Sequence, residues 1–105
     1  MNQPFHDIAI ATRKLLLASG PETTTEVSIS LEKPVPVTGS AEWRCAYRIV
    51  GPGANVMNYA TGVDALQAVQ LAIVMVETEI DVRFSESELM WDDGTPYRNG
   101  VPPGS

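Results

Sequence analysis

With 105 residues, 44% of them hydrophobic and 19% charged, the chain has the size and composition of one soluble domain that folds without disulfides or metals. Its formal net charge of −6 and its lack of clustered lysine and arginine argue against nucleic-acid binding, which needs basic side chains to displace counterions. The longest uninterrupted apolar run, residues 71–76, is far shorter than a membrane span. A single cysteine, Cys45, and the absence of a secretory signal pattern after Met1 lead us to expect a cytoplasmic protein. We also expect no metal or cofactor.

The first part of the chain predicts β-structure. Apolar residues within 8–18 are compatible with a strand, although the leucine-rich end of this stretch would also suit a helix by propensity. A glycine and proline turn signal follows. Residues 25–33 then alternate, with Val27, Ile29 and Leu31 on one face and polar side chains on the other. This alternation is typical of a strand with one buried and one solvated face.

Two further strands are predicted in the middle of the chain. The prolines in 34–36 end the second strand, because proline cannot donate to a ladder. Residues 43–50 form the third strand and place Trp43, Cys45, Tyr47 and Ile49 on one side. The glycine-rich and proline-rich loop at 51–55 turns the chain, so that residues 56–60 return as a fourth strand. The simplest topology is a four-stranded antiparallel meander.

One long helix is predicted from Gly62 to Phe84. The sequence from Thr61 to Asp64 resembles a capping box, in which the threonine hydroxyl would accept from the Asp64 amide. The apolar stripe expected to cover the sheet consists of Leu66, Val69, Ile73, Val76, Ile80 and Phe84, with Ala65 and Ala72 beside it. A second apolar group on the adjoining flank consists of Ala68, Leu71, Met75 and Val82. The apolar arc spans about 200°, about twice what a helix on one sheet requires.

The C-terminal part predicts little regular structure. After a polar break at 85–88, residues 89–91 are expected to form a short edge strand, and a turn follows at 92–96. The tail from about Tyr97 has no periodicity and is expected to be irregular. We therefore expect residues 1–105 to form a single α+β domain, with the long helix packed on one face of the four-stranded sheet.

Two motifs point to a family. Trp43-x-Cys45-x-Tyr47-x-Ile49-x-Gly51 lies on a predicted strand, Gly62-x-Asp64-x-x-Gln67-Ala68 opens the predicted helix, and Leu89-x-Trp91 follows late in the chain. This arrangement resembles a family of small bacterial domains of unknown function, over about residues 13–91. The resemblance implies a compact α+β domain and brings no established activity, cofactor or catalytic residue.

The sequence supplies no convincing catalytic or metal-ligating set. Cys45 would need a base to lower its pKa, and the one histidine, His6, has no signal that brings it near. A small buried hydrophobe is the favoured interpretation of this cysteine. The carboxylates between Glu77 and Asp93 lack the spacing of a calcium loop, and we interpret them as solvated. We therefore assign no catalytic, cofactor-binding or metal residue.

A small polar pocket is conceivable near the helix N-terminus, where Asp64 and Gln67 could join Tyr47 or Tyr59. Helix N-termini attract anions because their amides are unpaired. A carboxylate at Asp64 would repel an anion, however, and would itself satisfy those amides. Capping by Asp64, with Gln67 bonded to a loop, is therefore the favoured interpretation. The tyrosines are more often core residues at strand spacing than a ligand platform.

Three functions remain open. The first is a non-enzymatic protein-interaction module, expected to be a homodimer, in which Leu71, Met75, Ala68 and Val82 bury the helix flank left wet by the monomer. The second is an acidic, immunity-type protein that neutralises a basic target, since residues 62–105 hold eight acidic side chains against two basic ones. The third is a small-ligand-binding domain or enzyme that uses the pocket near the helix N-terminus. We expect no nucleic-acid or membrane partner.

Overall fold

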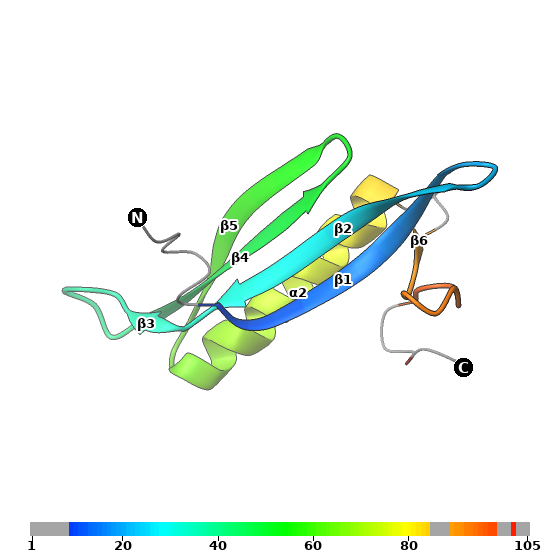
Figure 1. The fold of residues 1–105 in the computed structure, drawn as a ribbon. Helices are drawn as coiled ribbons and strands as arrows, with labels where there is room; N and C mark the ends of the chain where they lie inside the picture. Colours follow the sequence, from blue (N-terminus) through cyan, green and yellow to red (C-terminus); the bar gives the residue numbers. More distant parts are fainter. Residues whose placement is uncertain (1–8, 85–88, 99–101, 103–105) are drawn as a thin grey trace.

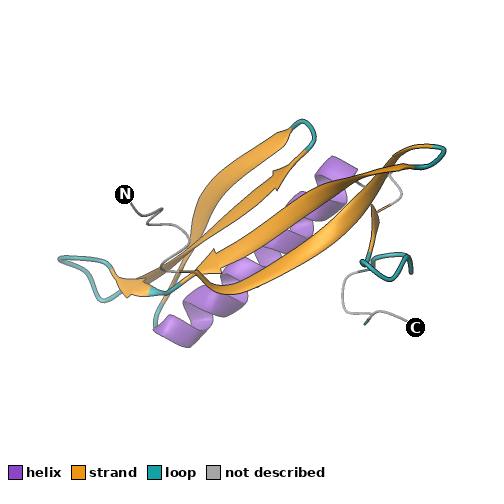
Figure 2. Ribbon diagram, in the orientation of Figure 1, coloured by secondary structure: helices purple, strands orange, loops and turns teal. Residues whose placement is uncertain are grey.

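A computed structural model describes residues 9–84, 89–98 and 102 of the chain (Figure 1). The elements in chain order are β1 (Ala9–Gly20), β2 (Thr23–Glu32), β3 (Val35–Pro36), β4 (Trp43–Gly51), β5 (Ala54–Gly62), α2 (Ala65–Phe84) and β6 (Leu89–Met90). The strands form one antiparallel sheet, and α2 covers one face of it (Figure 2). The expected α+β class is therefore confirmed.

The sheet is built on a meander of four long strands. β1 pairs with β2, β2 with β4, and β4 with β5, each pair antiparallel. The sheet has six strands within the described residues, whereas the sequence predicted a four-stranded meander and one short C-terminal strand; the short strand β3 was not predicted. β3 continues along the edge of β4 beyond the end of β2, after a break at Pro34. β6 pairs with β1 at Leu16 and Leu17, as the expected short edge strand.

The β4–β5 hairpin is longer and tighter than predicted. Its turn contains only Pro52 and Gly53, since Gly51 already pairs with Ala54. Gly53 has a φ of +69°, a conformation that glycine adopts without strain. β5 therefore extends over nine residues rather than the five predicted, and its register with β4 is continuous from end to end.

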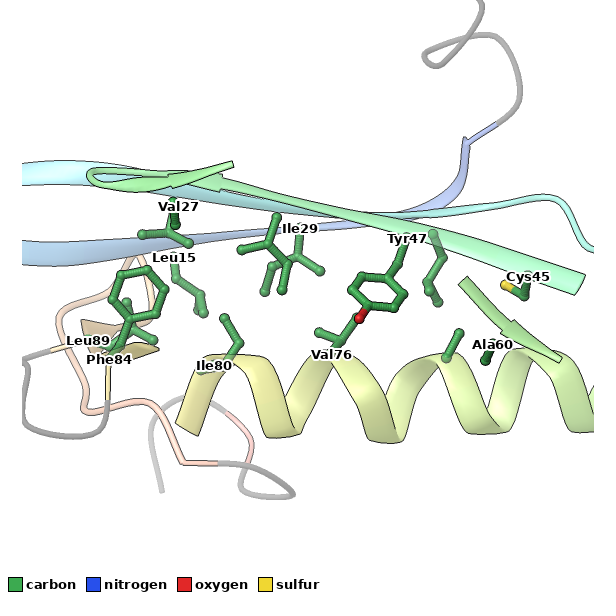
Figure 3. Packing of buried hydrophobic residues seen from close by; sticks show 14 of the residues in the cluster. Leu15, Val27, Ile29, Cys45, Tyr47, Ala60, Val76, Ile80, Phe84 and Leu89 are labelled. Carbon is green, nitrogen blue, oxygen red and sulfur yellow. The ribbon is translucent and has the colours of Figure 1, made fainter. Parts of the chain in front are cut away.

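The core lies between the sheet and the helix (Figure 3). The predicted inward-facing side chains of β2 and β4 are buried there, except Trp43, which is half-buried at the start of β4, and Tyr47 is the largest fully buried side chain. The buried residues of the cluster are Leu15, Val27, Ile29, Leu31, Cys45, Tyr47, Ile49, Ala54, Ala60, Ala68, Ala72, Val76, Ile80, Phe84 and Leu89. The alternation of the strand sequences thus identified the buried face of the sheet correctly.

The buried stripe of α2 agrees with the predicted one at Val76, Ile80 and Phe84, with Ala72 beside them, and differs from it in the first turns. It consists of Ala68, Ala72, Val76, Ile80 and Phe84, whereas the predicted contacts Leu66 and Ile73 are exposed. The reason is the close approach of the helix to Gly62, where an added Cβ would stand only 2.5 Å from the backbone nitrogen of Ala68. Only small side chains fit on the first turns of a helix that lies so near the sheet.

The C-terminal segment is attached to β1 through aromatic contacts with Arg13. The guanidinium carbon of Arg13 lies 4.9 Å from the ring centre of Trp91 and 5.8 Å from that of Tyr97. Arg13 Nη1 also donates to the Tyr97 hydroxyl at 3.2 Å. Cation–π contacts of this kind contribute about 0.5–2 kcal/mol each. Residues 89–98 are therefore fastened beside the first strand.

Candidate functional site

The residues at the helix N-terminus satisfy one another. Asp64 Oδ1 accepts a hydrogen bond from the Gln67 amide at 2.8 Å, and Gln67 Oε1 accepts one from the Val63 amide at 2.8 Å. Asp64 is therefore the N-cap, and the capping box predicted at Thr61 is wrong by three residues. The Asp64 carboxylate thus occupies the Gln67 amide of the first turn, and its negative charge disfavours an anion there.

The two tyrosines of the suggested pocket lie on opposite faces of the sheet. Tyr47 pairs with Asn58 and points toward α2, whereas Tyr59 pairs with Ala46 and points away from it. Successive residues of a strand alternate between faces, so the two rings cannot converge on one site. The structure thus does not bring Tyr47, Tyr59, Asp64 and Gln67 together.

Tyr59 lines a hollow on the open face of the sheet. This hollow has a volume of 470 Å³ and is lined by Glu32, Lys33, Val35, Arg44, Ala46, Met57, Asn58 and Tyr59. The guanidinium carbon of Arg44 lies 4.1 Å from the centre of the Tyr59 ring, so the arginine already covers one face of that ring. The hollow contains no arrangement of nucleophile and base among these residues.

The two buried titratable groups of β4 are held in their neutral forms. Burial raises the pKa of the Tyr47 hydroxyl, and the nearby Glu79 carboxylate raises it further. This hydroxyl is enclosed without a hydrogen bond of good geometry among the described residues. Burial also raises the pKa of the Cys45 thiol, with a smaller contribution from Glu32. A neutral, inaccessible thiol is a poor nucleophile, so Cys45 acts as a core residue.

The residues suggested for association divide between core and surface. Ala68 is 0% exposed beneath the chain's own sheet and is not available to a partner. Leu71 is 40% exposed and Val82 is 73% exposed, while Met75 is half-buried against the edge of the core. Val74, which the sequence analysis assigned to neither apolar group, is also exposed on this outer side of the helix.

The carboxylates of the C-terminal half make several contacts within the chain. Glu79 Oε1 accepts from Arg83 Nε at 2.9 Å. Asp93 Oδ1 accepts from the hydroxyl of Thr95 at 2.7 Å and from its amide at 2.9 Å, and these bonds lower the pKa of Asp93. Glu86 and Glu88 lie outside the described residues. Within the described ranges, no three His, Cys, Asp or Glu side chains gather into a group that would hold a metal ion.

Among residues 9–84, 89–98 and 102, no helix combines the length and apolarity that crossing a membrane requires. Within the described residues, the fold is thus an α+β structure in which α2 packs on one face of an antiparallel sheet. Residues 11–103 match the model of the family described as Domain of unknown function (DUF6968), and the chain belongs to that family. Comparisons with curated proteins and with solved structures gave no match.

Proposed function

We propose that the protein is a non-enzymatic protein-interaction module that acts as a homodimer through the outer flank of α2. The observation that carries this proposal is the absence of charged side chains from the first three turns of α2, where Leu71 and Val74 are exposed. Residues 65–76, about three turns of α2, contain no Asp, Glu, Lys or Arg, although the chain as a whole carries a formal net charge of −6. A helix that faces water in a monomer ordinarily has charged residues on its outer side.

One line of side chains along the outer side of this helix has a regular spacing: the exposed Leu71 and Val82, the half-buried Met75 and the exposed Thr78. Leu71, Met75, Thr78 and Val82 are separated by four, three and four residues, which is the spacing of a helix–helix seam. We call these four residues the helix seam. The Thr78 hydroxyl donates to the Val74 carbonyl at 3.0 Å. Its polar group is therefore bonded within the helix, and its methyl group is left for a partner.

A charged side chain introduced into the helix seam should weaken dimerisation. Leu71→Glu places a carboxylate in the seam, and burying it without a partner would cost several kcal/mol. Sedimentation equilibrium over a range of concentrations should show a wild-type dimer, and at least about a tenfold weaker association for the variant. Leu66→Glu is the matched control, since Leu66 is 67% exposed on the same helix but points about 140° away from Leu71. It should dimerise as the wild type does.

Two outcomes would contradict this function. A wild-type chain that stays monomeric up to about 1 mM would exclude a dimer of useful affinity. Equal weakening by Leu71→Glu and Leu66→Glu would remove the helix seam as the contact. The same runs at low and high salt separate this proposal from the acidic-partner alternative, because an uncharged contact should not weaken as salt screens charges.

A further inference from the structure

We propose that two copies pair edge to edge through β5, antiparallel about a two-fold axis at Asn58, so that one sheet continues through the dimer. This inference rests on the proposed function, because it specifies how the second copy reaches the helix seam. The two edges of the sheet, formed by β5 and β1, differ in how well they could accept another strand.

The β5 edge lacks the features that ordinarily prevent strand pairing. β5 pairs only with β4 within the described residues, and its nine residues include no charged side chain and no proline. Its register has no bulge. The opposite edge differs in three respects, since β1 carries Arg13 and Lys14, has a register shift after Ala9, and is partly covered by β6. Long, flat, uncharged edges are templates for another strand, and β5 forms one side of the sheet in Figure 1.

The geometry of the β4–β5 hairpin determines which backbone groups of β5 point away from β4. Gly51 and Ala54 flank a two-residue turn and form a hydrogen-bonded pair, so alternate residues of β5 bond to β4. The intervening residues, Asn55, Met57, Tyr59 and Thr61, direct their amides and carbonyls to the free edge. The Tyr59 amide indeed donates to the side chain of Asn58 at 2.8 Å rather than to β4. A partner strand would displace this side chain and take over the bond.

Full overlap of two antiparallel β5 strands fixes the axis. The central residue of Ala54–Gly62 is Asn58, so Asn58 would face Asn58 of the second copy, and Met57 would face Tyr59 of the second copy. The uncharged strands then meet without opposing like charges, which matters for a chain with a formal net charge of −6.

The same axis also centres the helix seam. Gly62 lies against the helix backbone at Gln67 and Ala68. Asn58 precedes Gly62 by four residues, which is about 13 Å along β5. The same distance along α2 corresponds to about nine residues, so Asn58 lies at the level of Val76 and Glu77. Figure 3 shows Tyr47, the β4 partner of Asn58, beside Val76.

A two-fold axis at this level places the first half of one helix seam beside the second half of the other. Leu71 would lie near Val82 of the second copy, and Met75 near Thr78 of the second copy. The four residues of the helix seam are therefore symmetric about an axis that was located from the strands alone.

The distance between the two α2 helices in the proposed dimer is also suitable for helix packing. α2 packs on β4 and β5, and strands lie about 4.8 Å apart, so its axis stands about 5 Å from the two-fold axis. Two such helices would be about 10 Å apart, which is the usual distance for packed helices. Ile73 lines a groove with β1 and β2, on the side of α2 away from β5. Leu71 is about 160° around the helix from Ile73 and therefore faces beyond the β5 edge.

A disulfide cross-link tests this register. In the proposed pairing Asn58 occupies a non-hydrogen-bonded pair, whose Cα atoms are about 4.5 Å apart and within the range of a disulfide. Oxidation of Asn58→Cys should give a covalent dimer on a non-reducing gel. Asn55→Cys is the matched control, because its Cα would lie about 20 Å from its own counterpart. The wild type should remain uncross-linked, since Cys45 is fully buried.

The outcomes distinguish the two proposals. Efficient cross-linking of Asn58→Cys, with little for Asn55→Cys, supports β5 pairing. Absence of cross-linking in a variant that sediments as a dimer overturns β5 pairing and leaves the homodimer intact. Equal cross-linking of both variants indicates random collision and also overturns this register. A monomeric wild type overturns the homodimer itself.

Discussion

Gly62→Ala tests the closest contact between the sheet and the helix. The added Cβ would lie 2.5 Å from the nitrogen of Ala68 and 2.9 Å from the carbonyl carbon of Gln67. These are backbone atoms, so the first turn of α2 must move by several tenths of an ångström. Overpacking of this kind costs about 1–3 kcal/mol. The loss of unfolded-state freedom offsets about 0.4–1 kcal/mol, because Gly62 does not have a positive φ.

We therefore expect Gly62→Ala to lower the free energy of unfolding by about 1–2 kcal/mol. Urea denaturation followed by circular dichroism would measure this as a lower midpoint with an unchanged slope. Gly20→Ala is the control, since a Cβ there meets Thr23 at an ordinary 3.6 Å. It should leave stability unchanged or slightly raised. Equal midpoints for the two variants would show that the helix does not depend on the absence of a side chain at Gly62.

Two other substitutions examine polar groups of the fold. Asp64→Ala should lower the free energy of unfolding by about 1 kcal/mol, because it removes the N-cap, and Asp64→Ser should restore most of it in the same urea assay. Tyr47→Phe should leave stability unchanged or raise it by up to about 1 kcal/mol, since the buried hydroxyl lacks a good hydrogen bond; a clear loss would show that the hydroxyl is bonded. Folding raises the pKa of Tyr47 above the ordinary tyrosine pKa of 10.0. The contribution of the neutral hydroxyl to the free energy of unfolding is therefore fully present below this ordinary pKa, and it is lost as the pH rises through the pKa of the folded state. Wild-type stability should therefore fall above about pH 10, and less steeply in Tyr47→Phe, as alkaline urea titrations would show.

The sequence predicted the strands better than the helix face. In β2 and β4 a period of two leaves one choice of buried face, so Val27, Ile29 and Tyr47 were placed correctly. In α2 two apolar stripes compete, and hydrophobicity favours the one that contains Leu66 over the one that contains Ala68. The structure buries Val76 and Ile80 of the first stripe, as predicted, but at the start of the helix it buries Ala68 in place of Leu66, because the backbone there lies against Gly62.

Tyr47 and Tyr59 lie on opposite faces of the sheet because of the register between β4 and β5. Treating 51–55 as a loop left the register of the fourth strand undefined, so Tyr59 could be placed on either face. The two-residue turn at Pro52 fixes that register and sends Tyr59 to the face opposite Tyr47. Both sequence motifs used to recognise the family also have structural explanations. Alternate residues of the strand motif fill the core, and Gly62, Asp64 and Gln67 dock and cap the helix.

The contact between Arg13 and the aromatic pair has a consequence for biosynthesis. Arg13 and Tyr97 are 84 residues apart, so the first strand cannot acquire its last neighbours until nearly the whole domain has been translated. At a synthesis rate of about 5–20 residues per second, this interval lasts several seconds. During that time one side of β1 lacks its C-terminal neighbours, and charged side chains such as Arg13 and Lys14 on a strand disfavour pairing with another chain.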